Sequence, residues 1–498
     1  MRHVLAIDEG TTGATCLVID ENGHIAGRGY REIPQHFPQP GWVEHDLGEI
    51  LDATVHAARA ALVEAAAVPD AIGITNQRET VALWERETGR PVARAIVWQD
   101  RRTAPRCAEL TEKGHARRIA ERTGLVIDPY FSATKLEYLI REGRLLERYR
   151  PEQLAAGTID SWLVWQLTGG AVHATDPTNA SRTMLYDIQR MEWSDELCEL
   201  FGIPRAVLPE VRPSSGSFGV TERSHFGANI PITGIAGDQQ SALFGQGCWS
   251  AGEGKNTYGT GAFVLLNAGR IRPRIDNVAE GLLTTIACAP DGSPAYAIEG
   301  SIFVAGAAVQ WLRDGLGLIA NAAESEALAR SLSGNDGVYF VPALTGLGAP
   351  YWEPHARGTM VGITRGTGRA HLVRAALESM AYSTGDVLAR MSAAGGVPFS
   401  RLRVDGGAAQ NDWLMQFQAD VLGVPVERPA TVETTALGAA GLAGIAAGVW
   451  SDAQSFLAHR ELRVFTPTYS RSEAEKLLAG WHRAVHAALS WARETAQQ

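Results

Sequence analysis

The chain repeats a short unit in which a buried strand runs into a tight turn of glycine and threonine. Such a turn follows the first predicted strand at Asp8-Glu9-Gly10-Thr11-Thr12 and recurs about 250 residues later at Tyr258-Gly259-Thr260-Gly261. In both places the chain returns as a second strand, at residues 14–19 and within residues 256–266, so each turn closes a hairpin. We predict a faint internal duplication, with two similar halves that each carry one such hairpin.

These hairpins have the chemistry of phosphate-binding turns. Backbone N–H groups in a tight turn form a concave site that binds an anion. Two such sites on facing domains can hold a triphosphate, as in the actin-like ATPase architecture. A third turn of this type, Asp405-Gly406-Gly407-Ala408, lies near the end of the chain. The pattern therefore predicts an α/β fold of two actin-like (RNase H-like) domains that flank a central cleft for nucleotide and substrate.

One carboxylate, Asp238, lies where the predicted strand of residues 232–237 becomes a helix. In an α/β protein, ligands bind at the carboxyl ends of strands, which makes this a favourable place for a reactive group. An aspartate here is also a common helix N-cap, and that is the alternative for Asp238 taken alone. The three glycine-rich turns favour the functional role, because with a central carboxylate they indicate a phosphotransferase that uses a nucleotide.

The length of the chain indicates two domains. A chain of 498 residues is too long for one core and suits two domains of about 250 residues each. Residues 245–254 include four glycines and are the best candidate for a hinge. We therefore predict an N-terminal domain of residues 1–248 and a C-terminal domain of residues 249–498.

Local signals place several elements within these domains. A buried strand is expected at residues 71–76, and a helix at residues 50–66 that is capped by Asp46. Another helix begins near Asn411, and residues 436–450 form a closely packed core helix.

Composition and short motifs exclude several classes of protein. The formal net charge of −10 argues against a nucleic-acid partner, which needs a concentrated basic surface. Five widely spaced cysteines form no metal-ligand or disulfide pattern and fit a reducing cytoplasm. We expect no signal peptide and no membrane span, since no apolar run reaches the roughly 20 residues that a span needs. There is no Walker A sequence, and the run Gly315-Leu-Gly317 follows a helix-like stretch, which argues against a dinucleotide fingerprint.

Several longer strings resemble the FGGY carbohydrate kinases. The resemblance covers nearly the whole chain, from about Ala6 to Trp481, and is far more specific than a glycine pattern. It is carried by residues 40–46 (PGWVEHD), 73–80 (GITNQRET), 95–99 (AIVWQ), 124–131 (GLVIDPYF), 237–245 (GDQQSALFG) and 345–352 (TGLGAPYW). The resemblance implies phosphorylation of glycerol to sn-glycerol 3-phosphate with ATP and Mg²⁺, by an enzyme that forms a homo-oligomer, a dimer or a tetramer.

The resemblance also implies an acceptor site, assigned to the N-terminal domain. Glycerol has hydroxyls on one edge and C–H groups on the other, so a selective site needs polar groups and an aromatic wall. The matching residues are Arg78 and Glu79 for the distal hydroxyls, Tyr130 for a further hydroxyl contact, Trp98 and Phe263 for the wall, Asp238 as the catalytic base, and Gln239 beside it. Alternatively, Arg78 and Glu79 form an exposed ion pair, and Trp98 is a core residue.

The nucleotide site is implied in the same way, with the adenosine in the C-terminal domain. Asp8 and Asp238 match the residues that hold magnesium, Asp8 directly or through water. The residues near the nucleotide are Gly10, Thr11 and Thr12 in the first hairpin, Gly259 and Thr260 in the second, Gly306 and Gln310 farther along, and Gly407 and Asn411 at the adenosine. As alternatives, Gln310 and Asn411 are helix caps.

Two residues of the first hairpin depart from the usual family pattern. Glu9 and Thr15 stand where relatives usually have glutamine and arginine. We expect both changes to make the phosphate loop more negative, by two formal charges together, and to raise the KM for ATP.

Two other polar segments are interpreted as structural. The loop of residues 175–182 is explained by turn chemistry and is assigned no catalytic role. Residues 44–46 (Glu-His-Asp) are three consecutive residues that cannot easily face one metal ion, so a structural role is favoured.

Two alternatives to phosphorylation of glycerol stay open. The chain could be a kinase of another small polyol or sugar, although the aromatic wall leaves little room for a larger sugar. It could also be a nucleotide-binding protein on an actin-like fold that no longer catalyses, and the altered first hairpin is the support for that alternative.

Overall fold

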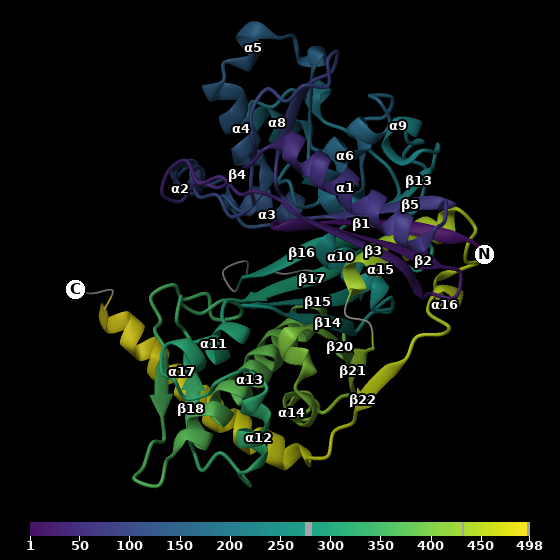
Figure 1. Ribbon diagram of the computed structural model, residues 1–498. Helices are drawn as coiled ribbons and strands as arrows, with labels where there is room; N and C mark the ends of the chain where they lie inside the picture. The colour runs from purple at the N-terminus through teal and green to yellow at the C-terminus, as the bar shows by residue number, and fades with distance from the viewer. Residues whose placement is uncertain (274–280, 431–432, 496–498) are drawn as a thin grey trace.

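The computed structural model of the protein describes residues 1–273, 281–430 and 433–495. Two lobes follow one another along the chain, and each is built around one large mixed sheet with helices packed on it (Figure 1). The first sheet has the strand order β13-β5-β1-β2-β3, and the second has the order β16-β17-β15-β14-β20-β21-β22. This arrangement confirms the predicted α/β fold.

The first lobe begins with the predicted hairpin. Its sheet consists of β1 (His3–Glu9), β2 (Gly13–Asp20), β3 (Ile25–Glu32), β5 (Ala71–Asn76) and β13 (Ile232–Gly237). The helix α1 (Leu47–Ala65) packs on β2 and β3 and begins after Asp46, whose carboxylate accepts hydrogen bonds from the N–H groups of Gly48 and Glu49. The predicted strand at residues 71–76 and the predicted cap are therefore confirmed.

Smaller elements of the first lobe lie between β3 and β13. The strands are β4 (Glu44–His45), β6 (Ala82–Glu85), β7 (Ala95–Ile96), β8 (Leu154–Gly157), β9 (Ala174–Thr175), β10 (Tyr186–Asp187), β11 (Glu192–Trp193) and β12 (Glu210–Val211). The helices are α2 (Ala104–Glu112), α3 (Ala116–Thr123), α4 (Ser132–Glu142), α5 (Leu145–Arg148), α6 (Ile159–Leu167), α7 (Pro177–Ala180), α8 (Asp195–Leu200) and α9 (Arg223–Phe226).

The register of the parallel strands brings three chain segments to one edge of the first sheet. Glu9 at the end of β1 pairs with Asn76 at the end of β5, and Asn76 pairs with Gly237 at the end of β13. All three strands are parallel, so their carboxyl ends coincide, as in other open α/β sheets. The residues that follow them, at positions 10, 77 and 238, therefore emerge side by side.

The second lobe repeats the plan of the first. The strand β14 (Glu253–Tyr258) pairs antiparallel with β15 (Ala262–Gly269) and parallel with β20 (Arg401–Gly406), as β1 pairs with β2 and β5. Tyr258 lies opposite Gly406, which places the second and third glycine turns beside each other. The predicted internal duplication is thus confirmed in the topology of the sheets.

The other elements of the second lobe extend and cover its sheet. The strands are β16 (Leu282–Cys288), β17 (Pro294–Ile302), β18 (Tyr339–Val341), β19 (Thr359–Val361), β21 (Val426–Pro429) and β22 (Leu462–Phe465). The helices are α11 (Gly306–Asp314), α12 (Glu324–Arg330), α13 (Arg369–Gly395), the 3₁₀ helix η4 (Gly407–Gln410), α14 (Asp412–Leu422), α16 (Ala453–Phe456) and α17 (Arg471–Thr495).

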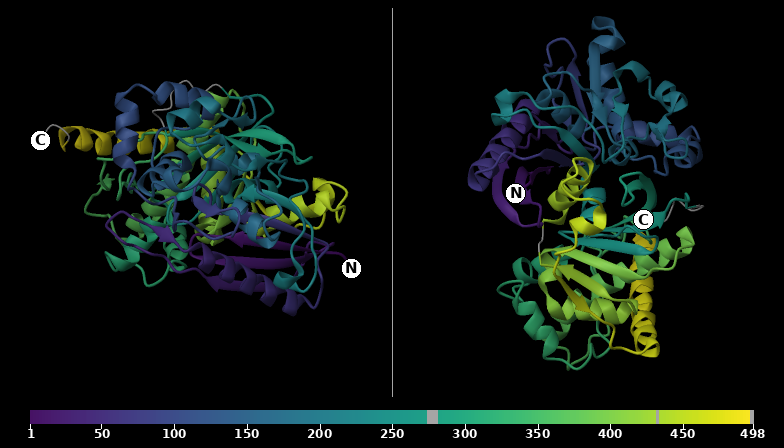
Figure 2. Two further views of the ribbon diagram at one scale, coloured as in Figure 1. Left: turned by 90° about the horizontal axis from the view of Figure 1, so that it is seen from above. Right: turned by 90° about the vertical axis from the view of Figure 1, so that its right-hand side faces the viewer.

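One helix from late in the chain lies against the sheet of the first lobe. The helix α15 (Thr434–Ala446) packs on β1, β5 and β13 and on α10 (Asp238–Gly245), beside the purple strands in Figure 1 and in the right-hand view of Figure 2. It corresponds to the predicted core helix of residues 436–450, but it ends at Ala446. Its alanines share one apolar core with Val4, Ala6 and Leu17 of the first sheet.

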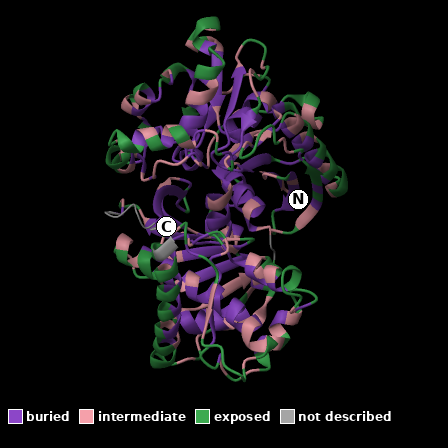
Figure 3. Ribbon diagram, turned by 90° about the vertical axis from the view of Figure 1, so that its left-hand side faces the viewer, coloured by how far each residue is buried: buried purple, intermediate pink, exposed green. Residues whose placement is uncertain are grey.

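The central strands of both sheets are buried, and the exposed residues gather on the outer helices, loops and edge strands (Figure 3). The continuous burial of β5 and of most of β13 is typical of parallel strands that are covered on both faces. Among the described residues, no helix is long and apolar enough to cross a bilayer.

Candidate active site

Asp238 is the first residue of α10, at the carboxyl edge of the first sheet. The N-cap of this helix is Gly237, and no side chain caps it, so the interpretation of Asp238 as the N-cap is wrong. The Asp238 side chain is 33% exposed, whereas its partner Arg78 is only 2% exposed, and Arg78 Nε lies 3.0 Å from Asp238 Oδ1. A reachable carboxylate is therefore held against a buried guanidinium.

Arg78 belongs to a buried cluster of charged side chains. The residues are Arg78 and Glu79 after β5, Arg182 after α7, and Glu299 on β17, and all are at most 3% exposed. Arg78 Nη1 lies 2.6 Å from Glu299 Oε2, and Arg182 Nε lies 2.6 Å from Glu79 Oε1. Arg78 Nε lies 3.9 Å from Glu79 Oε1. The alternative that these two residues form an exposed ion pair is wrong, because each is buried and has a closer partner.

The backbone at Glu79 is strained. Its φ angle is 63°, in the left-handed region that non-glycine residues seldom occupy. Ser132 Oγ donates a hydrogen bond of 3.0 Å to the Glu79 carbonyl. Such strain persists where the surrounding contacts hold it, and it is found most often at binding and active sites.

Gln239 lies between Asp238 and a lysine from the second lobe. Its Nε2 donates to Asp238 Oδ2 at 3.4 Å, and its Oε1 accepts a short hydrogen bond from Lys255 Nζ. Lys255 is fully buried on β14 and also donates to Thr257 Oγ1 at 2.7 Å. Burial lowers the pKa of Lys255, and the nearby carboxylates of Asp405 and Asp238 oppose that shift.

Two of the three predicted aromatic residues lie together. The rings of Trp98 and Tyr130 meet edge to face with centroids 5.6 Å apart. Trp98 Nε1 also donates to Thr11 Oγ1 at 2.9 Å, which ties the predicted acceptor wall to the first hairpin. Phe263 is half-buried on β15, opposite Thr257. That its ring faces Trp98 stays a prediction.

In the first hairpin, Asp8 lies near the end of β1, and Gly10, Thr11 and Thr12 form the turn between β1 and β2, where Gly10 N donates to the Gly13 carbonyl at 3.0 Å. Burial, followed by the charge on Asp238, raises the pKa of Asp8 to about 7. The charge on Asp238 thus acts on Asp8, the other carboxylate predicted to hold magnesium.

Glu9 is the last residue of β1, and its side chain is buried. Gln77 Nε2 donates to both oxygens of Glu9 at 3.3 and 3.4 Å. Burial raises the pKa of Glu9 well above its usual value, and this rise exceeds the lowering by the Gln77 amide. Burial therefore favours the neutral form of this carboxyl. The expectation that Glu9 adds a negative charge to the phosphate loop stays a prediction, and the buried position of Glu9 weighs against it. Thr15 is partly exposed and lies opposite Asp8.

The second hairpin packs on the start of α11. The N–H of Gly306 donates to the Gly259 carbonyl at 3.0 Å, and the N–H groups of Ala305 and Ala307 donate to the Thr260 carbonyl at 2.9 and 3.0 Å. A Cβ on Gly306 would lie 2.6 Å from the Gly259 oxygen, so only glycine fits this approach. The structure therefore brings Gly259, Thr260 and Gly306 together.

The remaining predicted nucleotide residues are exposed or half-buried and lie in or beside helices of the second lobe. Gln310 is exposed within α11, after its first turn, so it is not a cap. Gly407 is exposed at the start of η4. Asn411 is the N-cap of α14, and its Oδ1 accepts from Leu414 N at 2.9 Å. The predicted helix start near Asn411 is confirmed, and its contact with a nucleotide stays a prediction.

The loop of residues 175–182 has the predicted turn chemistry, because the Asp176 carboxylate accepts hydrogen bonds from the N–H groups of Thr178 and Asn179. It also makes buried contacts with the ends of two strands. Thr178 Oγ1 accepts a hydrogen bond of 2.8 Å from Gly237 N, directly before Asp238. Asn179 exchanges side-chain hydrogen bonds of 3.1 Å with Asn76 at the end of β5. Arg182 pairs with Glu79 and Glu299. These buried hydrogen bonds join the loop to the ends of β5 and β13.

Sequence reasoning missed Arg182, Lys255 and Glu299. A usable signal exists for two of them, since Lys255 and Glu299 are charged residues within buried strands. An unpaired charge inside a protein is costly, so a charged residue in such a strand requires a partner. The partner itself is far away in sequence and cannot be identified from local pattern.

Residues 44–46 have structural roles, as predicted. Glu44 pairs with Arg102 at 2.9 Å, and Asp46 caps α1. In the part of the chain that the structure describes, no group of three or more His, Cys, Asp or Glu side chains is arranged to hold a metal ion. A magnesium ion bound by two carboxylates, here those of Asp8 and Asp238, needs further ligands that these two residues do not supply.

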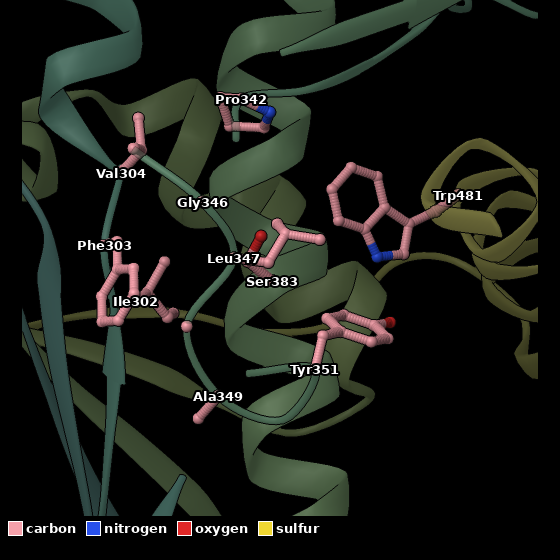
Figure 4. A pocket seen from close by; sticks show the side chains of 11 residues that line it. Ile302, Phe303, Val304, Pro342, Gly346, Leu347, Ala349, Tyr351, Ser383 and Trp481 are labelled. Carbon is pink, nitrogen blue, oxygen red and sulfur yellow. The ribbon is translucent and has the colours of Figure 1, made fainter. Parts of the chain in front are cut away.

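A small cavity lies in the second lobe, and Figure 4 shows its lining. Its volume is about 20 Å³, enough for a water molecule but not for a sugar or nucleotide. It is lined by Ile302, Phe303, Val304, Pro342, Gly346, Leu347, Gly348, Ala349, Tyr351, Ser383 and Trp481, none of which is a predicted site residue.

Comparison with known proteins gives consistent results along the whole chain. Residues 3–245 match the N-terminal domain of the FGGY family of carbohydrate kinases, and residues 254–447 match its C-terminal domain. The chain is 56% identical to a glycerol kinase of Acidovorax sp., covering 97% of this chain and 99% of that protein. It is 53% identical to glycerol kinase 2 of Thermotoga maritima, covering 99% of both.

A solved structure supports the same assignment. The crystal structure of Plasmodium falciparum glycerol kinase with ADP superimposes with a TM-score of 0.93 at 36% identity, and the match covers 98% of each chain. Both lobes are therefore matched in sequence and in arrangement. The chain belongs to the FGGY family of carbohydrate kinases.

Proposed function

We propose that the protein transfers the terminal phosphoryl group of ATP to glycerol and releases sn-glycerol 3-phosphate and ADP. The observation that carries this proposal is the pairing of the reachable Asp238 carboxylate with the buried Arg78 guanidinium at the carboxyl edge of the first sheet. The near-complete match to proteins named glycerol kinase supports glycerol as the acceptor.

Asp238 acts as the general base. It accepts the proton of the attacking hydroxyl, and its contact with Arg78 and Gln239 keeps the carboxylate oriented. A base must lie within hydrogen-bond reach of the proton that it removes, and Asp238 is partly exposed beside a buried cluster of charged side chains. Phosphoryl transfer depends mainly on positioning and charge stabilisation, which such a set supplies.

The acceptor binds beside Asp238. Arg78 and Glu79 bind the distal hydroxyls, and Tyr130 provides a further hydroxyl contact. Trp98 and Phe263 pack against the carbon side, as the wall of a small site. The tight pairing of Arg78 and Glu79 with their buried partners supports this role, because it fixes both side chains before a ligand arrives.

Magnesium fits the pair of Asp8 and Asp238. The charge on Asp238 contributes to the raised pKa of Asp8, and a divalent cation held by both carboxylates would relieve that repulsion. Magnesium is usually bound by one or two carboxylates together with substrate phosphates. When bound, it neutralises charge that develops on the phosphate oxygens.

The nucleotide lies between the two hairpins. Gly10, Thr11 and Thr12 bind its phosphates from one side, and Gly259 and Thr260 bind them from the other. Gly306, Gln310, Gly407 and Asn411 hold the nucleoside. Residues 1–248 and 249–498 are the two domains that close on it, and closure excludes water, which would otherwise compete with glycerol as the acceptor.

Release of ADP from ATP and Mg²⁺, measured in a coupled assay with and without glycerol, tests the proposed function. Glycerol should stimulate ADP release, and xylulose should do so far less. Faster turnover of xylulose would make the protein a sugar kinase. Nucleotide binding with no turnover of either acceptor would indicate a protein that no longer catalyses. Light scattering on the same sample checks the predicted homo-oligomer.

A further inference from the structure

Glu299 and Arg182 are buried charges that the proposed mechanism does not use. Their side chains are 1% and 0% exposed. Glu299 lies in the middle of β17, where its strand neighbours are Leu265 on β15 and Leu283 on β16. Taking a carboxylate out of water into such surroundings is costly even when it is paired, and buried ion pairs are a poor means of adding stability. A role other than packing is therefore indicated.

The Glu299 carboxylate binds two arginines at once. Its Oε2 lies 2.6 Å from Arg78 Nη1, and its Oε1 lies 3.3 Å from Arg78 Nη2 and 2.9 Å from Arg182 Nη2. Burial alone would raise the pKa of Glu299, but Arg182 and Arg78 together lower it to about 2. Glu299 is thus an ionised group that fixes both guanidinium planes.

The contact determines which edge of Arg78 faces Asp238. The two terminal nitrogens of Arg78 are directed to Glu299, and its Nε is left 3.0 Å from Asp238 Oδ1. An arginine has a rigid, planar set of donors, so binding at one edge orients the other.

The same carboxylate fixes Glu79 through Arg182. Arg182 Nη2 binds Glu299 Oε1, while Arg182 Nε binds Glu79 Oε1 at 2.6 Å. Glu299 is therefore the shared link between the two residues that the proposed function assigns to the distal hydroxyls of the acceptor.

The cluster is not arranged for greatest stability. Arg182 Nη1 is buried and has no hydrogen-bond partner among the residues that the structure describes. A buried donor without a partner is destabilising, and a purely structural cluster would be expected to satisfy it.

We propose that Glu299 is a positioning residue for the acceptor, supplied by the second lobe, whereas the polar residues assigned to direct contact with glycerol all belong to the first. This inference rests on the proposed function. It means that the acceptor site is complete only when β17 is docked against the ends of β5 and α7. Glu299 acts through Arg78 and Arg182 and does not touch the reacting atoms.

The substitution Glu299→Gln tests this role, because it removes the charge and keeps the size of the side chain. We expect the KM for glycerol to rise about 10- to 100-fold, the range expected for lost charge-assisted hydrogen bonds. The KM for ATP should change less than about 2-fold. A merely structural role would lower the amount of active enzyme and leave both KM values unchanged.

The matched control is Glu378→Gln. Glu378 is also 1% exposed and pairs with a buried arginine, Arg374, at 2.7 Å, but it is not part of the proposed site. It should lower thermal stability without raising the KM for glycerol. If Glu299→Gln does not fold, Glu299→Asp keeps the charge but shortens the side chain, and we expect its glycerol KM to rise as well.

The outcomes are distinguishable. An unmodified enzyme that does not turn over glycerol contradicts the proposed function, and with it this inference. An active enzyme whose folded Glu299 variants keep the normal KM for glycerol overturns the inference alone. An equal rise in both KM values would also overturn it, since the effect would then not be confined to the acceptor.

Discussion

At the scale of single residues, Asp238 owes its proposed chemistry to the contrast between its exposure and that of its neighbours. Arg78, Glu79 and Arg182 are buried, and Asp238 is the charged residue of the set that a ligand can reach. The substitution Asp238→Asn keeps the shape of the side chain but removes the proton acceptor. We expect kcat to fall about 10²- to 10⁴-fold with little change in ATP binding.

Steady-state kinetics together with fluorescence titration of ATP measure both quantities for Asp238→Asn. Asp314→Asn, a change to a carboxylate paired with Arg313 on the surface, serves as the control and should behave like the unmodified protein. If Asp238→Asn retained most of its turnover, the assignment of the base would be wrong.

Substitutions at Glu9 and at Thr15 are expected to have different effects on the KM for ATP. Glu9 is buried against Gln77 and favours its neutral form, so Glu9→Gln should change the KM for ATP by less than about 2-fold. Thr15 is partly exposed opposite Asp8, and Thr15→Arg adds a cation worth about 1.5–3 kcal/mol at a phosphate. The arginine variant should therefore lower the KM for ATP about 10-fold or more.

Separate kinetics of the two single variants decide between Glu9 and Thr15. The KM for glycerol should be unchanged in both. A fall in the ATP KM of Glu9→Gln as large as that of Thr15→Arg would show that Glu9 does carry its charge toward the phosphates.

At the scale of elements, the contact between α10 and α15 depends on a glycine. A Cβ added to Gly438 would clash with the Ser241 carbonyl on α10, which is backbone and cannot rotate away. Although alanine favours a helix by about 1 kcal/mol, overpacking between two helices costs about 1–3 kcal/mol. We expect Gly438→Ala to lower the melting temperature.

Calorimetry measures the effect of Gly438→Ala. Gly334→Ala is the control, because an added Cβ there would meet no atom closer than 4.0 Å. Equal melting temperatures for the two variants would mean that α10 and α15 accommodate the added Cβ without loss of stability.

The packing around His173, which lies between α6 and β9, predicts that the stability of the protein depends on pH. The ring of His173 meets those of Trp84 and Trp165 in T-shaped contacts. Its Nδ1 lies 2.9 Å from Arg86 Nη2, and its Nε2 lies 3.0 Å from the Ala156 carbonyl. Burial, followed by the charge on Arg86, lowers the pKa of His173 to about 3. The ring is therefore neutral in the folded protein near neutral pH.

The sign of this pH dependence follows from comparison with the unfolded chain, in which histidine has a pKa of about 6.5. Between about pH 6.5 and pH 3 the unfolded state binds a proton that the folded state does not. The free energy of unfolding should therefore fall with decreasing pH, by up to about 1.4 kcal/mol per pH unit for this residue. Above about pH 6.5 the contribution is fully present.

Denaturant unfolding at pH 7, 6, 5 and 4 measures this slope. His173→Gln should reduce the slope by about one proton, and His355→Gln, on the surface, should not. Identical slopes for the His173 variant and the unmodified protein would contradict the assignment.

At the scale of the whole molecule, the first sheet depends on a segment from late in the chain. The helix α15 shares a core with Val4, Ala6 and Leu17 and approaches Gly73 and Gly234 at places where a side chain would clash. A fragment of residues 1–248 should therefore fail to fold by itself and should expose apolar surface. Co-expression with residues 249–498 should restore a soluble complex.

Circular dichroism and binding of an apolar dye test the isolated fragment. Cooperative unfolding of residues 1–248 alone, without dye binding, would show that the sheet does not require α15.

Much of this arrangement could be predicted from the sequence because its signals are local. The hairpin at β1 and β2, the strand β5 and the cap at Asp46 follow from turn residues, apolar runs and side-chain hydrogen bonds within a few positions. The repeat of the hairpin at Tyr258 likewise indicated the duplication of the sheets. Most candidate site residues came from longer strings that resemble a family.

The contacts that orient those residues could not be predicted in the same way. Glu299 is 221 positions from Arg78, and Arg182 is 103 positions from Glu79. The strand position of Glu9 does not reveal how completely its side chain is buried. Burial and long-range pairing are properties of the assembled lobes, so local pattern reports them poorly.

The return of α15 to the first sheet has a consequence for synthesis of the chain. The last strand of that sheet ends at Gly237, and α15 begins about 200 residues later, at Thr434. At about 5–20 residues per second, a ribosome needs about 10–40 s to make the intervening segment. Throughout that interval the nascent sheet lacks the helix that covers one of its faces. We expect chaperones that bind exposed apolar surface to engage the emerging chain in this interval and to leave once α15 has been made.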